Sequence, residues 1–156
     1  MPGGIDPRPG ACVQLLKLAL LDLRHQAVAG CGFEMQIDDR TGDTPQSRRK
    51  RQRADPPHIL LTTPESLALM VSYEDAARTF GGLRRIVIDE IHALAESKRG
   101  DQLMLALARL QSLCPDLRRV GLSATVDDPA AIARYLARHP DPCDIVLADP
   151  GPAPDI

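Results

Sequence analysis

Apolar residues along the chain follow two spacings, and each spacing predicts a different kind of element. Short apolar or alternating runs predict strands, and these cover residues 33–39, 58–62, 84–89, 118–123 and 143–149. Apolar residues that recur every three or four positions predict helices over residues 12–28 and 101–113. Helix-start residues, namely Thr44-Pro45, Pro64 and Asp128-Pro129, predict helices over residues 45–53, 64–72 and 129–138, and residues 74–80 form a further helical piece. Residue pairs such as Pro56-Pro57 and Gly81-Gly82 separate the elements, because proline and glycine interrupt regular structure.

The alternation of short apolar strands with helices predicts an α/β fold. Nearly continuous apolar strands are typical of a parallel sheet that is covered by helices on both faces. Ligands of such sheets bind at the carboxyl ends of the strands. Three polar clusters lie at the carboxyl ends of predicted strands, and we expect them to meet at one edge: Thr62-Thr63-Pro64-Glu65, Asp89-Glu90-Ile91-His92 and Ser123-Ala124-Thr125.

The length of 156 residues corresponds to one domain. We expect residues 1–10, which are rich in glycine and proline, to be irregular, residues 11–149 to form the domain, and residues 150–156 to form a tail. The sequence has no run of 18 apolar residues and no secretory signal pattern. It therefore predicts no membrane partner and a cytoplasmic location.

Charge and aromatic content bear on nucleic-acid binding. The net charge of −2 gives no global basic signal, so any basic surface must be local. Residues 40–53 supply one candidate, which contains Arg48, Arg49 and Arg51. This segment predicts either phosphate contacts or a solvated helix face, and the sequence does not choose between them. The scarcity of aromatic residues argues against a stacking platform for bases.

Asp89 and Glu90 stand at the end of the predicted strand 84–89. A carboxylate held there by a rigid strand can bind Mg²⁺ through water, with phosphate oxygens completing the shell. The neighbouring carboxylate can act as a general base on water, an effect worth on the order of 10²–10⁴ in rate. The alternative is an acid pair that only solvates the strand end, and the four letters alone favour neither.

The other two clusters are ambiguous when taken singly. Ser123 and Thr125 can hydrogen-bond a neighbour such as His92, although small hydroxyl residues at strand ends are usually turn formers or caps. Thr63 and Pro64 stand at a helix start, where free N–H groups bind phosphate, although the same residues also make a simple cap.

Cysteines and histidines predict no metal centre. Cys12, Cys31, Cys114 and Cys143 are far apart in the sequence, and the four histidines share no ligand spacing. We expect free thiols with structural roles, because no activating neighbours are visible.

The three strand-end clusters together resemble the motifs of superfamily 2 DEAD/DEAH-box helicases. In order along the chain they resemble the TPE-type nucleic-acid motif, the DEAD/DEAH-type Walker B box and the SAT motif. The segments VIDEIHALAESKRGDQLMLALARL and VGLSATVDDPAAIARYLA are similar to the large helicase-related (Lhr) group.

The resemblance implies a RecA-like fold of the P-loop NTPase type, with ATP and Mg²⁺ as cofactors and DNA or RNA as partner. Asp89 would bind Mg²⁺–ATP through water, and Glu90 would be the catalytic base. The coupling residues would be His92, Ser123 and Thr125. The residues that contact the nucleic-acid backbone would be Thr41, Gly42, Thr63, Pro64 and Glu65.

The sequence departs from this family at the phosphate-binding loop. A Walker A motif requires Gly-Lys, and the three lysines, Lys17, Lys50 and Lys98, follow Leu16, Arg49 and Ser97. The chain thus resembles an N-terminally truncated part of the first RecA-like domain. We expect it to be inactive alone, for lack of Walker A and of a second RecA-like domain. The alternative is a catalytically dead nucleic-acid-binding or regulatory module.

The resemblance implies that the strand that carries the phosphate-binding loop is missing from this sequence. In the family fold that strand lies beside the DEIH and SAT strands. Without it we expect a gap or a new strand pairing, together with an exposed apolar edge.

Overall fold

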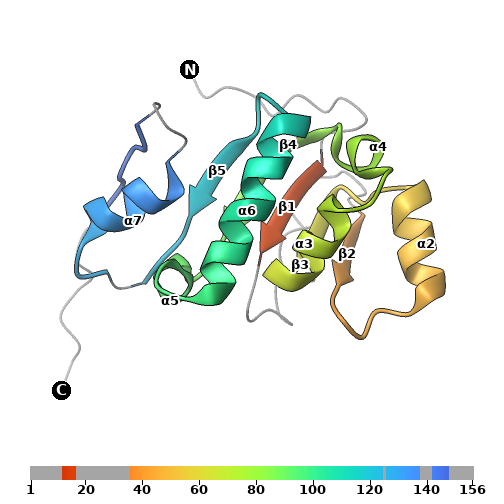
Figure 1. Cartoon of the computed structure of the whole chain (residues 1–156), viewed down its shortest axis with the longest axis horizontal. Helices are drawn as coiled ribbons and strands as arrows, with labels where there is room; N and C mark the ends of the chain where they lie inside the picture. The colour runs from red at the N-terminus through yellow and green to blue at the C-terminus, as the bar shows by residue number, and fades with distance from the viewer. Residues whose placement is uncertain (1–11, 17–35, 125, 138–141, 148–156) are drawn as a thin grey trace.

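A computed structural model of the chain describes residues 12–16, 36–124, 126–137 and 142–147 (Figure 1). Its five strands form one parallel sheet in the order β2-β3-β1-β4-β5. The strands are β1 (Cys12–Leu16), β2 (Ile37–Arg40), β3 (Ile59–Thr62), β4 (Leu83–Ile88) and β5 (Arg118–Gly121). The predicted α/β fold with a parallel sheet is confirmed.

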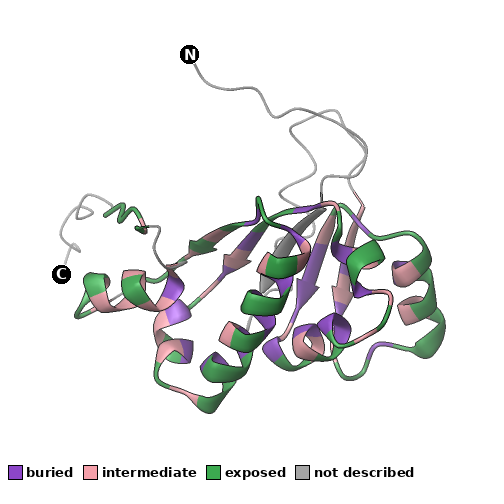
Figure 2. Ribbon diagram, turned by 45° about the horizontal axis from the view of Figure 1, so that its top comes forward, coloured by how far each residue is buried: buried purple, intermediate pink, exposed green. Residues whose placement is uncertain are grey.

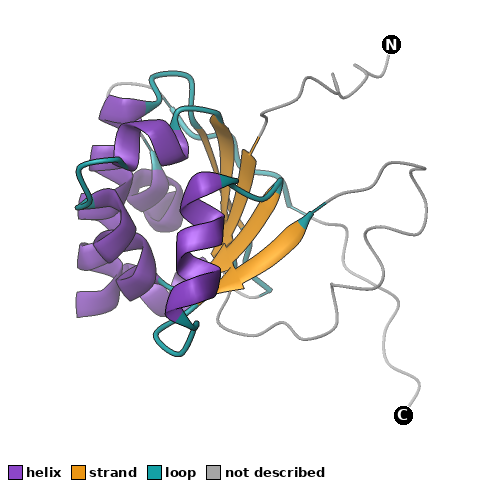
Figure 3. Cartoon of the chain, turned by 90° about the vertical axis from the view of Figure 1, so that its right-hand side faces the viewer, coloured by secondary structure: helices purple, strands orange, loops and turns teal. Residues whose placement is uncertain are grey.

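Six helices are described, and all of them lie on one side of the sheet (Figure 3). They are α2 (Gln46–Ala54), α3 (Pro64–Val71), α4 (Ala76–Phe80), α5 (Ile91–Ala95), α6 (Lys98–Leu113) and α7 (Pro129–Leu136). The prediction of helices on both faces is therefore not met within the described part of the chain. None of these helices is long and apolar enough to cross a lipid bilayer.

Side-chain caps explain where the main helices begin. Thr63 accepts a hydrogen bond from the Ser66 amide at 3.3 Å, with Pro64 as the first helical residue of α3. Asp128 does the same for α7 by accepting from the Ala131 amide at 3.0 Å. Such caps each contribute roughly 1 kcal/mol, because they satisfy an amide that has no helical partner.

The core lies between the helices and the sheet face that they cover, where Figure 2 shows most of the buried residues. Ile86 and Ile88 of β4 are fully buried. They pack in one cluster with Leu67 of α3 and with Leu103 and Leu107 of α6. Each such side chain stabilises the fold by roughly 1.5–3 kcal/mol through removal of apolar surface from water. This packing holds β4, and therefore the residues that follow it, in a fixed place.

Two predicted elements are wrong. The helix predicted over residues 12–28 is a strand at Cys12–Leu16, where β1 pairs with both β3 and β4. A short apolar run fits a buried strand and a helix equally well, and here pairing on both sides decides. The strand predicted over residues 143–149 is not formed by residues 143–147, which have no regular structure. Val146 is 92% exposed, with no strand described beside it.

β4 and β5 pair directly, in continuous register from Arg85–Arg118 to Ile88–Gly121. No gap therefore separates the DEIH and SAT strands in the described sheet. β5 is its edge strand, and Val120 and the following Leu122 are exposed. The predicted irregular segment 1–10 and tail 150–156 lie outside the described residues.

Candidate functional site

The carboxyl ends of four parallel strands bring the predicted polar residues to one edge of the sheet. Thr41 and Gly42 follow β2, Thr63 follows β3, Asp89 follows β4, and Ser123 lies two residues beyond β5. Because all the strands run in the same direction, these positions lie on one rim (Figure 1). The rim divides into a β4–β5 side, with the acids, and a β2–β3 side, with the hydroxyl residues.

The turn after β4 is strained. Glu90 is the one described residue other than glycine with a positive φ, at 50°, in the left-handed region. That conformation costs roughly 1–2 kcal/mol for an L-residue. Its amide donates to Asp89 Oδ1 at 3.1 Å, and α5 begins at the next residue. Strained backbone of this kind concentrates at functional sites, where the surrounding structure holds it in place.

The β5 end is tied to this turn. The Leu122 amide donates to the Ile88 carbonyl at 2.8 Å, and the Ile91 amide donates to the Leu122 carbonyl at 3.1 Å. His92 Nδ1 and Ser123 Oγ share a hydrogen bond of 2.5 Å, which is one of the two alternatives that the sequence left open for Ser123. Glu90 Oε2 lies 3.4 Å from the same His92 nitrogen. Thr125, the other predicted coupling residue, lies outside the described residues.

Metal binding at this turn would rest on a single strand-end carboxylate. Within the described segments, no three His, Cys, Asp or Glu side chains gather into a cage for an ion. Mg²⁺ does not require one, because it keeps several waters and usually takes only one or two carboxylates together with substrate phosphates. The donor chemistry of Asp89 therefore fits Mg²⁺ that arrives with a nucleotide.

The β2–β3 side carries a small pocket of about 150 Å³. Its lining residues are Arg40, Thr41, Gly42, Arg49, Ser66 and Leu69. The Thr41 amide donates to Thr44 Oγ1 at 2.9 Å, which shapes the turn, and a Cβ atom on Gly42 would have no neighbour within 4 Å. The first turn of α3 reaches the pocket through Ser66, so hydroxyl, guanidinium and helix N-terminal groups converge there.

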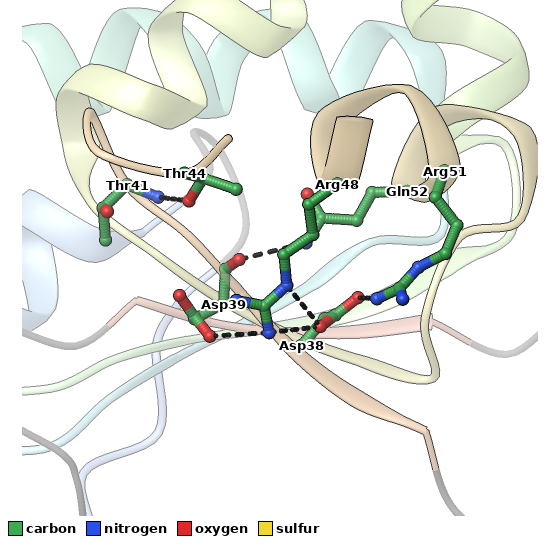
Figure 4. A network of polar contacts seen from close by, with 7 residues as sticks. All are labelled: Asp38, Asp39, Thr41, Thr44, Arg48, Arg51 and Gln52. Atoms are coloured by element: carbon green, nitrogen blue, oxygen red, sulfur yellow. Dashed lines mark hydrogen bonds and ion pairs between the residues drawn. The ribbon is translucent and has the colours of Figure 1, made fainter. Parts of the chain in front are cut away.

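Two arginines of the basic helix α2 bind one buried carboxylate. Arg48 and Arg51 both donate to Asp38, which is 3% exposed, at 2.8 Å each (Figure 4). Burial raises the pKa of Asp38, but the hydrogen bonds from Arg51 and Arg48 outweigh it and hold the pKa below its usual range. Arg48 Nη2 also lies 3.1 Å from Asp39 Oδ1, so two carboxylates face the two guanidinium groups and compensate their charges within the fold.

Arg49 is bonded differently. Its guanidinium donates to three main-chain carbonyl oxygens, those of Thr44 at 2.7 Å, Thr41 at 3.3 Å and Gly42 at 2.5 Å. Carbonyl oxygens do not cancel a positive charge, so Arg49 presents its cation at the pocket wall. Among the three arginines that the sequence nominated, Arg49 is the one that lines the pocket.

Replacing Asp38 with asparagine is expected to lower the free energy of unfolding by about 2 kcal/mol at pH 7, because an amide accepts poorly from two guanidinium groups. The lowered pKa of Asp38 gives stability that is present above the unfolded pKa of about 3.9 and is lost as the pH falls through the folded value. The difference from wild type should therefore shrink below about pH 4. Urea unfolding between pH 3 and pH 7 measures it.

Asp39→Asn is the matched control, because the Asp39 side chain is 34% exposed and its carboxylate lies 3.1 Å from the same Arg48. It should cost less than about 1 kcal/mol. Equal losses in the two variants would contradict the central place of Asp38.

Glu65, predicted to contact nucleic acid, is bound by Arg99 of α6. Arg99 Nε donates to Oε1 at 2.5 Å and Nη2 to Oε2 at 3.3 Å. The Arg99 hydrogen bonds lower the pKa of Glu65, so its carboxylate stays ionised.

Sequence reasoning missed Ser66, Leu69 and Arg99 as parts of this rim, and it counted Arg40 only among the charges of the basic segment 40–53. Arg40 is almost fully buried and stacks on Tyr73, with its guanidinium carbon 5.9 Å from the ring centre. A charged residue at the end of a short strand, next to Thr41-Gly42, was an available signal for Arg40. Nothing local in the sequence signals the pairing of Arg99 with a residue 34 positions away.

Cys114 is a structural thiol. It is buried, and its Sγ donates to the Phe80 carbonyl at 2.9 Å. Burial raises its pKa, which keeps the thiol protonated and unreactive. The predicted structural role is confirmed for this cysteine, and Cys31 lies outside the described residues.

Comparison with known proteins points to one family. Residues 20–132 match the profile of the DEAD/DEAH box helicase family. The ATP-dependent helicase Lhr-Core of Methanothermobacter thermautotrophicus is 44% identical over 113 residues, which are 71% of this chain and 13% of that protein. The Lhr helicase/uracil glycosylase of Escherichia coli is 46% identical over 103 residues, 65% of this chain and 7% of that protein.

A solved structure agrees with the sequence comparisons. The helicase Lhr of Mycobacterium smegmatis, bound to ssDNA and AMP-PNP, superposes with a TM-score of 0.70 and 33% identity. The match covers 83% of this chain and 19% of that one. The chain thus spans less than a fifth of the length of each of these three proteins.

Proposed function

The chain belongs to the DEAD/DEAH box helicase family, with similarity to Lhr helicases, and from this premise we propose that it supplies two parts of a nucleic-acid-dependent ATPase. One part is a surface for the sugar-phosphate backbone on the β2–β3 side of the rim. The other is the metal and water side of an ATP site at the turn after β4. The observation that carries the proposal is the meeting of these groups on one rim of a parallel sheet.

On the ATP side, we assign Asp89 to Mg²⁺, through water, and Glu90 to the attacking water. Mg²⁺–ATP, when bound, supplies the phosphate oxygens that complete the metal shell. Glu90 is exposed, so its carboxylate can reach a water beyond the strand end. The hydrogen bond between His92 and Ser123 supports a coupling role for these two residues, because it joins the turn after β4 to the chain after β5.

On the nucleic-acid side, we assign backbone contacts to Thr41, Gly42, Thr63, Pro64 and Glu65, with Arg49 providing the charge. The support is the pocket between the turn after β2 and the start of α3, which neutral donors line together with the cations of Arg40 and Arg49. A phosphate held by such groups gives affinity without sequence specificity. Arg48 and Arg51 would add long-range attraction only, since Asp38 binds both.

Residues 1–156 have no Gly-Lys pair to hold the β- and γ-phosphates. We therefore propose that this chain by itself does not turn over ATP. A second RecA-like domain would be needed for catalysis, because it would supply an arginine finger, worth roughly 10³–10⁵ in rate.

The test combines binding and turnover in one preparation. The chain should bind a fluorescently labelled single-stranded oligonucleotide, with affinity that falls as KCl rises, and should release no phosphate from ATP above background with or without the oligonucleotide. No binding at low salt would reject the nucleic-acid surface. Phosphate release that disappears in Glu90→Gln would reject the claim that the chain is inactive alone.

A further inference from the structure

Two helices begin side by side at the rim, and one ion pair joins their first turns. Glu65 is the second residue of α3 and Arg99 is the second residue of α6. α3 and α6 pack against each other (Figure 1). Arg99 holds Glu65 with two guanidinium nitrogens on two carboxylate oxygens, the two-pronged geometry that best fixes orientation.

The place of Arg99 is unfavourable for α6 itself. A helix N-terminus carries partial positive charge, so a cation in the first turn is repelled and an anion is favoured. Glu65 suits its position in α3, whereas Arg99 does not suit its position in α6. Glu65 offsets the mismatch, but both side chains are nearly half exposed, and such pairs contribute little to global stability. The pair is therefore better explained by what it positions.

Arg99 lies just after the junction of α5 and α6, and α5 begins directly after the acid pair Asp89-Glu90. Ser97 Oγ donates to the Leu94 carbonyl at 2.8 Å and accepts from the Gly100 amide at 3.1 Å, which fixes the start of α6 on the end of α5. α5 follows directly after Glu90. The ion pair thus links the start of α6, which follows Asp89 and Glu90 by way of α5, to the first turn of α3, where Ser66 lines the pocket.

We propose that Arg99 is a positioning residue for nucleic-acid binding: it neutralises the Glu65 carboxylate and holds the first turn of α3 ready for a phosphate. The inference rests on the proposed nucleic-acid surface. Without Arg99, the negative charge of the Glu65 carboxylate would lose its guanidinium partner and would stand beside the proposed phosphate path. The expected defect therefore arises from an uncompensated anion and from a loosened helix start.

A double-mutant comparison with a single-stranded oligonucleotide tests this directly. Arg99→Gln should weaken binding about fivefold, the effect of one partly exposed like charge. Adding Glu65→Gln to that variant should restore affinity to within about twofold of wild type. Lys98→Gln, with the same charge change one residue earlier in α6, is the matched control and should weaken binding less than Arg99→Gln does.

The outcomes separate the two claims. A double variant as weak as Arg99→Gln would mean that Arg99 itself contacts phosphate, and would overturn the positioning role. Failure of the wild-type chain to bind would instead reject the proposed function. Amide hydrogen exchange tests, without any ligand, whether Arg99 holds the first turn of α3. Arg99→Gln should accelerate exchange of the Ser66 and Leu67 amides. Unchanged exchange rates at these two amides would overturn the inference.

Discussion

Replacing Gly100 with alanine is expected to lower the free energy of unfolding by about 3 kcal/mol, the upper end of the usual cost of overpacking. An alanine Cβ would lie 1.9 Å from the Leu94 carbonyl oxygen and 2.8 Å from its carbon, and both are main-chain atoms. It would also lie 2.7 Å from Tyr135 Oη. Main chain cannot move aside as a flexible side chain can, so α6 would have to leave the end of α5.

The sign of this effect is informative. In an ordinary helix, alanine is more favourable than glycine by roughly 0.5–1 kcal/mol, so a loss at Gly100 reports the close approach of two helices. Gly42→Ala is the control for stability, because a Cβ there would meet nothing within 4 Å. Urea unfolding of both variants provides the measurement. A Gly100→Ala protein as stable as wild type would show that the α5–α6 corner is not packed as described.

Arg49→Gln is expected to weaken oligonucleotide binding about tenfold, the value of one charge-assisted hydrogen bond to phosphate. Arg49 lines the pocket, and its hydrogen bonds go to main-chain carbonyls, so its charge is available to an incoming anion. Arg51→Gln removes the same charge from the same helix. It should have a smaller effect, because Arg51 is bound to Asp38.

Arg49 also braces the turn at Thr41 and Gly42, so loss of binding has two possible origins. Thermal unfolding separates them: Arg49→Gln should melt close to wild type if the lost charge dominates. A fall in affinity that appears only together with a large fall in melting temperature would contradict the assignment of Arg49 to phosphate.

Strong local signals made much of the fold predictable. Helices α3 and α7 begin at Thr63-Pro64 and Asp128-Pro129, where the first residue of each pair caps the helix and the proline is its first helical residue. The apolar run of β4 was identified as a strand. Prediction failed at residues 12–16, because a short apolar run has no period of its own and pairing with β3 and β4 decides its structure.

The site was predictable to the extent that parallel strands dictate it. The meeting of His92 with Ser123, 31 residues apart, follows from two strand ends that share one rim. The sequence could not predict the roles of the individual arginines, because basic residues occur along the whole length of α2. Which of its side chains turns inward depends on Asp38, 10 residues before Arg48 and 13 before Arg51, and on the angle at which the helix packs.

The salt dependence of single-stranded oligonucleotide binding tests most directly the claim that this rim holds a phosphate backbone. The logarithm of the association constant should fall linearly with the logarithm of the KCl concentration, and Arg49→Gln should reduce that slope by about 0.7, the value for one phosphate contact on a single strand. Arg51→Gln should reduce it less. An association constant that does not change with KCl concentration would contradict the account. So would a slope that changes in Arg51→Gln and stays the same in Arg49→Gln.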